Sequence, residues 1–80
     1  MPRTNLVSAQ EKLQLLLRQV RQEAGLTQAD IALRVGQPQS FVSKYESGER
    51  RLDILELHAV CSAVGLSMTD FISRLEQMLK

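Results

Sequence analysis

The sequence predicts a compact all-α domain of five helices in a chain of 80 residues. All four glycines stand where an apolar run at helical spacing stops, and glycine adopts the left-handed conformation of a helix end without steric cost. Four segments place a capping Ser, Thr or Asp three residues before a carboxylate, which is typical of helix starts. No segment alternates apolar and polar residues as a half-buried strand does, so we assign no sheet.

The first two expected helices cover residues 8–24 and 27–35, and each starts with such a capping pattern. Ser8 begins the first and Thr27 the second. The carboxylate three residues later also suits the positive end of the helix dipole. Apolar residues then recur every three to four positions, as an amphipathic helix requires. They are Leu13, Leu16, Leu17, Val20, Ile31, Ala32 and Val35.

The other three expected helices cover residues 39–47, 53–64 and 67–78. Pro38 is restricted to the flank or first turn of a helix, so the third helix begins near residue 39. Asp53 and Ser67 mark the remaining starts. The whole chain, 1–80, reads as one domain in which 1–7 form a flexible arm. The apolar stripes are Val42, Tyr45, Leu57, Val60, Val64, Phe71, Ile72, Leu75 and Leu79.

Composition excludes several classes of protein. The chain is 44% hydrophobic and 24% charged, which argues against disorder. The longest unbroken apolar stretches, such as Leu15–Leu17, are three residues long, so no membrane segment is expected. The N-terminus lacks the apolar region of a signal peptide. A single cysteine, Cys61, excludes an intrachain disulfide and fits a reducing, cytoplasmic location.

Charge and motifs favour a binding protein over an enzyme. Residues 1–51 carry eight basic against five acidic side chains, and 52–80 carry two against four, so the basic part can face phosphates. His58 and Cys61 are three residues apart, but no other His or Cys exists to complete a zinc site, so no metal is expected. No catalytic triad or Gly-rich phosphate loop is recognisable, so we expect no catalytic residue and no cofactor.

The second and third expected helices are joined by a short turn at Gly36, which is the arrangement of a helix-turn-helix. The small Ala32 allows the two helices to approach closely. With Val42 and Tyr45 facing inward, the opposite face of the third helix carries an amide, short hydroxyls and one cation, unlike the Glu/Lys mixture of a merely solvated face. Its residues are Gln39, Ser40, Ser43, Lys44 and Ser47.

The segments Thr27–Gly36 and Gln39–Arg50 resemble the phage-repressor helix-turn-helix family, of the Cro/cI or xenobiotic-response-element type. The resemblance runs from about residue 13 to residue 72. Gln37 and Pro38 depart from the family pattern, which usually has an aliphatic residue and then Ser or Thr. The resemblance implies a lambda-repressor-like fold and a transcriptional regulator that inserts the 39–47 helix into the major groove of double-stranded DNA.

The resemblance also implies roles for individual residues. Gln28 would hold a phosphate at the start of its helix, and the amide of Gln39 would read a base edge, as amides do with adenine. Arg21 and Glu46 match a pair that forms a partly buried ion pair. Phe41 has two interpretations, contact with a thymine methyl or packing against the domain. Further base-reading candidates are Ser40, Ser43 and Lys44, and further phosphate-binding candidates are Ser47, Arg50 and Arg51.

The tail, 67–80, carries an apolar ridge that either closes the domain or forms a twofold dimer contact. A symmetric dimer can read two half-sites one helical turn apart, so we expect a homodimer on a palindromic operator. Two alternatives stay open. One is a protein-interaction module with a protein partner, such as the antitoxin of a toxin pair, and the other is a restriction-modification controller. The candidate dimer contacts are Phe71, Ile72, Leu75, Met78 and Leu79.

Overall fold

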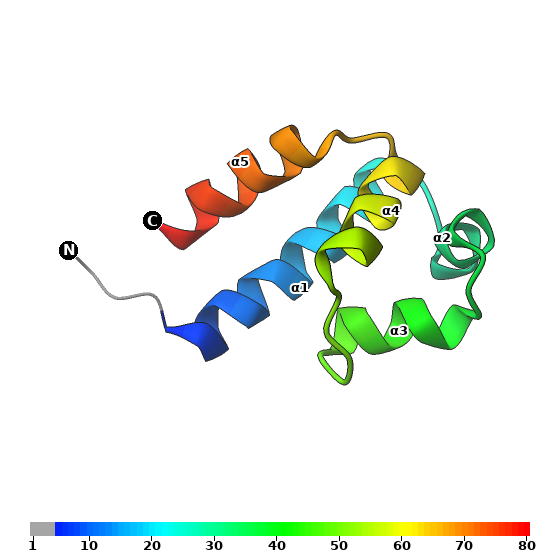
Figure 1. Ribbon diagram of the computed structural model, residues 1–80, viewed down its shortest axis with the longest axis horizontal. Helices are drawn as coiled ribbons and strands as arrows, with labels where there is room; N and C mark the ends of the chain where they lie inside the picture. The colour runs from blue at the N-terminus through cyan, green and yellow to red at the C-terminus, as the bar shows by residue number, and fades with distance from the viewer. Residues whose placement is uncertain (1–4) are drawn as a thin grey trace.

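The computed structural model describes residues 5–80, which form five helices and no strand. The predicted all-α class is confirmed, and each helix boundary lies within two residues of its expected place. In chain order the helices are α1 (Leu6–Glu23), α2 (Gln28–Val35), α3 (Gln39–Ser47), α4 (Ile54–Val64) and α5 (Met68–Leu79), as labelled in Figure 1.

Side-chain caps define the starts of α2, α4 and α5. The Thr27 hydroxyl accepts from the Asp30 N–H at 3.1 Å, and the Asp30 carboxylate accepts from the Thr27 N–H at 2.8 Å. Asp53 and Glu56 make the same reciprocal pair at 2.7 and 2.9 Å. Ser67 accepts from the N–H three residues later at 3.0 Å. These three predicted caps are confirmed, because each depends only on residues within one turn.

The start of α1 differs from the expectation. The cap is Asn5, whose side-chain oxygen accepts from the N–H groups of Val7 and Ser8 at 2.9 and 3.2 Å. Asn caps a helix as well as Ser does, and nothing between residues 5 and 8 breaks a helix, so the helix extends to the earlier cap. The prediction of Ser8 as the cap was therefore wrong, as was a flexible arm over 5–7. Residues 1–4 of that expected arm lie outside the described residues.

The turn between α2 and α3 is short. Gly36 ends α2 in the left-handed region, with φ at 70°, which favours glycine. Its N–H donates to the Leu33 carbonyl, and the Gln37 N–H donates to the Ala32 carbonyl at 2.9 Å. Pro38 then precedes the first residue of α3. These hydrogen bonds close the end of α2, and α3 begins three residues after Gly36, so the reversal between the two helices is tight.

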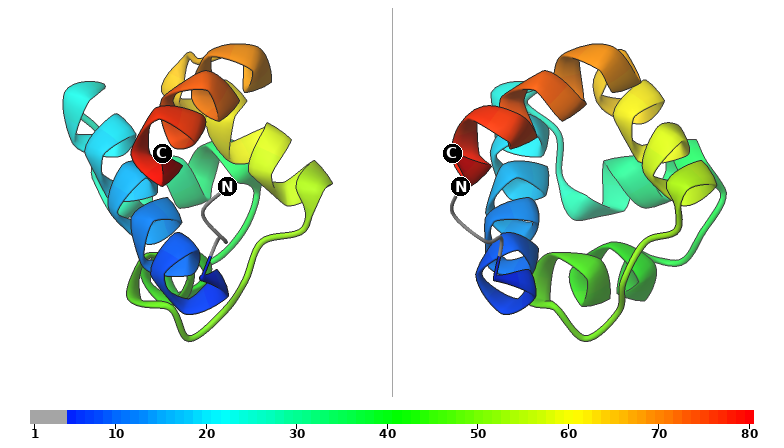
Figure 2. Two further views of the ribbon diagram at one scale, coloured as in Figure 1. Left: turned by 90° about the vertical axis from the view of Figure 1, so that its left-hand side faces the viewer. Right: turned by 60° about the vertical axis from the view of Figure 1, so that its left-hand side comes forward.

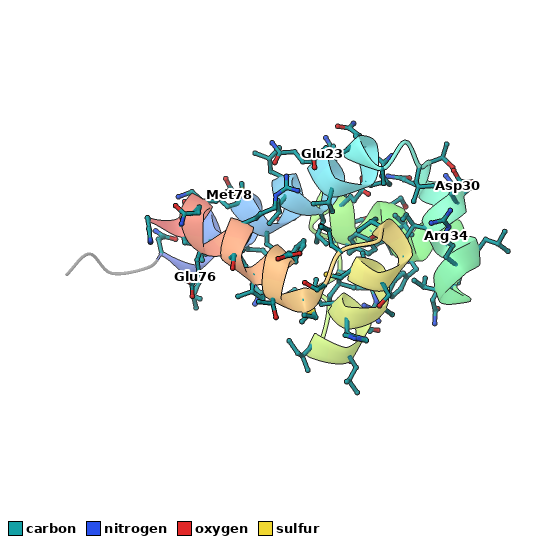
Figure 3. The ribbon with its side chains drawn as sticks, turned by 90° about the horizontal axis from the view of Figure 1, so that it is seen from above. Glu23, Asp30, Arg34, Glu76 and Met78 are labelled. Atoms are coloured by element: carbon teal, nitrogen blue, oxygen red, sulfur yellow. The ribbon has the colours of Figure 1, made fainter. Side chains whose placement is uncertain are left out.

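The core lies where the helices converge. Two polar contacts tie distant elements together around it: Arg34 of α2 donates to the carbonyl of Ala63 in α4 at 2.7 Å, and Arg74 of α5 pairs with Glu23 of α1. Figure 3 labels Arg34 and Glu23 on their helices. The buried apolar residues are Leu16, Leu17, Val20, Ile31, Ala32, Phe41, Val42, Tyr45, Leu57, Val60, Cys61, Ala63 and Phe71.

The helices α3 and α5 lie on opposite sides of the molecule. In Figures 1 and 2, α5 runs along the top and α3 along the bottom, with α1 and α4 between them. Within the described residues no single helix is long and apolar enough to cross a membrane; α4 and α5 pass together by length and composition, with a bend of 103° between them. The side of α3 that faces away from α5 is the surface on which the candidate site lies.

Candidate nucleic-acid interface

The outer face of α3 presents the expected polar side chains. Val42 and Tyr45 are buried on the inner face. Burial of Tyr45 raises the pKa of its hydroxyl, so this side chain stays neutral in the core. The hydroxyls of Ser43 and Ser47 donate to backbone carbonyls one turn earlier, at 3.3 and 3.1 Å. The outer residues that the structure exposes are Gln39, Ser40, Lys44 and Ser47, with Ser43 half-buried beside them.

Glu46 is the one buried charged residue among the described residues, at 3% exposed, and side chains from two other helices converge on it. Arg21 of α1 donates from Nε to Oε2 at 2.7 Å and from Nη2 to Oε1 at 3.0 Å. The structure therefore contains the Arg21–Glu46 ion pair that the resemblance implies. Hydrogen bonding to the Glu46 carboxylate raises the pKa of Arg21. Arg18 lies nearby, with Nε 3.6 Å from Oε1.

Gln28, the expected phosphate ligand, belongs to the same cluster. It is the first residue of α2 and is half-buried, and its amide nitrogen donates to Oε1 of Glu46 at 3.2 Å. This contact was not predicted. It joins the N-terminus of α2 to the last turn of α3, so the two ends at which the resemblance implies DNA contacts are held by one carboxylate.

Arg50 and Arg51 follow α3 but have different surroundings. The Arg50 guanidinium donates to both carboxylate oxygens of Glu56, at 3.0 and 2.6 Å, and lies 4.6 Å from the centre of the Phe41 ring. Hydrogen bonds from Arg50 and from the Asp53 N–H lower the pKa of Glu56 to about 2. The Arg50 guanidinium that was expected to meet a phosphate is thus engaged with Glu56 in the structure, and this pair joins the loop to α4. Arg51 is exposed.

Phe41 belongs to the core. It is 8% exposed, and its ring packs edge-on against Tyr45 with the two centroids 5.5 Å apart. Of its two predicted interpretations, packing is the one that the structure contains. A thymine contact from this ring would require it to leave the core, so we do not propose that contact.

The apolar ridge of α5 mostly faces inward. Phe71 is fully buried, so its prediction as a dimer contact was wrong: the ring fills the core of its own chain. Ile72, Leu75 and Met78 are half-buried because they pack against the same core, and Leu79 is half-buried at the helix end. Figure 3 labels Met78 near the C-terminal end of α5. Helical spacing predicted the apolar face of α5, but it could not tell which of its side chains are fully buried in the core and which are only half-buried.

Comparisons with known sequences match this chain to helix-turn-helix proteins. A family model described as helix-turn-helix matches residues 17–71. The chain is also similar to an uncharacterized HTH-type transcriptional regulator, y4dJ of Sinorhizobium fredii, with 32% identity over 54 residues. That alignment covers 68% of this chain and 70% of the relative.

Solved structures share the whole fold. An XRE-family like protein from Pseudomonas syringae pv. tomato has a TM-score of 0.83 and 43% identity, covering 90% of this chain and 88% of that one. The wild-type restriction-modification controller protein C.Esp1396I has a TM-score of 0.81 and 25% identity, covering 86% and 90%. A mutant of that controller has been solved bound to its highest affinity operator site.

Proposed function

Because this chain belongs to the XRE-type helix-turn-helix family of DNA-binding transcriptional regulators, we propose that it reads an operator by inserting α3 into the major groove. The outer face of α3 carries this proposal. Its exposed side chains are an amide, short hydroxyls and the single cation of Lys44, while its inner face is buried in the core, so the helix offers a narrow polar surface on a rigid support. A helix of this kind fits the major groove of B-DNA.

Gln39 and Lys44 are the main base-reading residues in this proposal. Gln39 opens α3, where a recognition helix contacts base edges, and its amide can both donate to and accept from adenine. Lys44 is exposed one turn later and can donate to a guanine edge or to a phosphate. Ser40 and Ser43 are short, so they let the backbone of α3 approach the base pairs.

Phosphate contacts from the ends of the two helices position α3. Gln28 lies at the N-terminus of α2, where unpaired N–H groups and the helix dipole favour an anion. Its hydrogen bond to Glu46 keeps the amide at that end. Arg51 and Ser47 are exposed at the other end of α3. Such contacts set orientation and affinity, and the base contacts supply sequence preference.

The proposal includes a homodimer on a palindromic operator. One domain offers few base contacts, and a twofold dimer doubles them on two half-sites. A role as a restriction-modification controller is a second candidate within the same class. It is supported by the likeness to C.Esp1396I over most of both chains. Finding the selected operator upstream of restriction and modification genes would separate this role from other regulation.

The test is selection of bound duplexes from a random library, followed by substitutions. Gln39→Ala should weaken binding to the selected operator by about 1–3 kcal/mol and relax preference at one base pair. Gln28→Ala should weaken binding to all sequences alike, because a phosphate contact carries no base information. The control is Thr69→Ala. Thr69 is exposed on α5, the helix that lies on the opposite side of the molecule from α3 (Figure 1), so this variant should change neither the affinity nor the base preference.

Two results would count against this function. If no duplex is enriched, the chain does not read an operator. If duplexes are enriched but Gln39→Ala binds the selected operator as tightly as the unchanged chain, the role assigned to the start of α3 is wrong.

A further inference from the structure

Arg18 of α1 is the most exposed side chain of the cluster around Glu46. Its Nε lies 3.6 Å from Oε1 of Glu46, which is too long for a hydrogen bond. The Arg18 side chain is 51% exposed, whereas that of Arg21 in the same cluster is 14% exposed. This contact therefore leaves the N–H groups of the Arg18 guanidinium free to bind another group.

The Glu46 carboxylate is already satisfied without Arg18. It accepts from Arg21 at 2.7 Å on Oε2 and at 3.0 Å on Oε1, and from the Gln28 amide at 3.2 Å on Oε1. Two guanidinium groups thus face one carboxylate, which leaves an excess of positive charge on the exposed side of the cluster. Such a charge suits an anion, and in a DNA-binding protein the anion is a backbone phosphate.

Arg18 and Gln28 point donors at the same place from different helices. The Nε of Arg18 and the Nε2 of Gln28 both lie within 3.6 Å of one atom, Oε1 of Glu46. Arg18 belongs to α1 and Gln28 is the first residue of α2. Donors this close together can both reach the oxygens of a single phosphate.

An open space beside Arg18 leaves room for that phosphate. A hollow of about 320 Å³ lies between α1 and the last turn of α3. Of the two carboxylates in its lining, that of Glu46 is paired with Arg21. That of Glu11 is seven residues from Arg18, about 10 Å along the helix, where salt at about 0.1 M screens its repulsion. The lining residues are Glu11, Gln14, Leu15, Arg18, Glu46 and Ser47.

We propose that Arg18 binds the same DNA phosphate as Gln28, so that α1 takes part in DNA binding together with α2 and α3. The inference rests on the proposed function, in which Gln28 holds a phosphate. A guanidinium can form two parallel hydrogen bonds with a phosphate and brings a full positive charge, whereas the Gln28 amide is neutral. Arg18 thus supplies the electrostatic attraction, and Gln28, held by Glu46, supplies the fixed position.

The experiment measures binding of the full chain to a duplex of random sequence at a series of salt concentrations. Arg18→Gln should reduce the slope of log binding constant against log salt concentration by about one, because a cation is lost from a phosphate. Its binding at about 0.1 M salt should be weaker by roughly tenfold. Arg18→Lys keeps the charge and should keep the slope.

Stability separates this role from a structural one. Urea unfolding of Arg18→Gln should match that of the unchanged chain, because Arg21 and Gln28 still satisfy the Glu46 carboxylate. Arg74→Gln is the matched control. It removes the same charge from α5, on the opposite side of the molecule from α3 (Figures 1 and 2), and should keep the slope. If Arg18→Gln also keeps the slope, the inference is wrong.

The double variant of Arg18→Gln and Gln28→Ala tests whether the two side chains hold one phosphate. Losses of affinity at independent sites multiply, whereas residues that share a ligand are coupled. The double variant should therefore lose less affinity for the random duplex than the product of the two single losses. If the losses multiply, Arg18 and Gln28 bind separate phosphates, and the shared contact is wrong.

The random duplex also separates this inference from the proposed function. If Arg18→Gln lowers the slope but selection from a library enriches no duplex, the phosphate contact stands and operator reading fails. If an operator is selected and Arg18→Gln keeps the slope, operator reading stands and the contact fails. If the chain binds no duplex at all, both are wrong.

Discussion

Arg21 and Glu46 form a two-point ion pair, with nitrogen–oxygen distances of 2.7 and 3.0 Å, which joins α1 to the last turn of α3. The Glu46 side chain is 1% exposed and that of Arg21 is 14% exposed. Removing one partner of such a pair leaves the other charged and away from water, which costs more than the pair itself contributes. The pair therefore holds α3 in one orientation relative to α1.

Arg21→Met should lower the free energy of unfolding by about 3 kcal/mol, because Glu46 stays buried without its main partner. Urea denaturation at neutral pH measures this loss. The matched control is Arg74→Met. Arg74 also forms a two-point pair, with Glu23, but the two side chains are 37% and 58% exposed, so we expect a loss within about 1 kcal/mol. Equal losses in the two variants would contradict a special role for the Glu46 cluster.

The Arg50–Glu56 pair predicts a specific loss of stability in acid. The pKa of Glu56 is about 2 in the folded chain against an ordinary value of 4.5, so its contribution to stability is complete above pH 4.5 and is lost as the pH falls toward 2. Glu56→Gln should therefore be less stable than the unchanged chain at neutral pH, and the difference should shrink through that window. Urea titrations at a series of pH values measure it.

Arg50→Met is the control for that titration. It removes the guanidinium that lowers the pKa of Glu56 while keeping an apolar chain over the Phe41 ring. It should lose the part of the acid-dependent contribution that comes from the guanidinium and keep the part that comes from the Asp53 N–H, so adding Glu56→Gln to it should cost less than Glu56→Gln alone. If the difference in unfolding free energy between the unchanged chain and Glu56→Gln stayed constant from neutral pH down to pH 2, the ion pair between Arg50 and Glu56 would be contradicted.

Arg50 and Arg51 should differ in DNA binding. Arg51→Ala should reduce the slope of log binding constant against log salt concentration by about one, because one phosphate contact is lost. Its unfolding free energy should not change, since Arg51 is exposed. Arg50→Met should lower stability and leave the salt slope unchanged. If Arg50→Met instead reduced the salt slope and left stability unchanged, Arg50 would be the phosphate contact, and the role given to its pair with Glu56 would be wrong.

The helices and most of their caps were predictable from the sequence. Thr27, Asp53 and Ser67 each cap through hydrogen bonds to a residue three positions later, so their signal is complete within one turn. The start of α1 could not be predicted in this way. Asn5 and Ser8 can both cap a helix, and the apolar pattern that follows fits a helix that begins after either residue.

The contacts of the candidate site were less predictable. Gln28 meets Glu46 across 18 positions in the chain, and no spacing rule links an amide to a carboxylate at that distance. The Arg21–Glu46 pair came only from the resemblance.

By itself, the sequence determined the five helices, the tight turn at Gly36 and the polar face of α3, because these depend on residues within about one turn of each other. Only the tertiary structure decided that Phe41 and Phe71 are core residues, that Arg50 is held by Glu56 and that Leu55 stays exposed. Those outcomes depend on which helix packs over each side chain, and that is set by contacts between segments far apart in the chain.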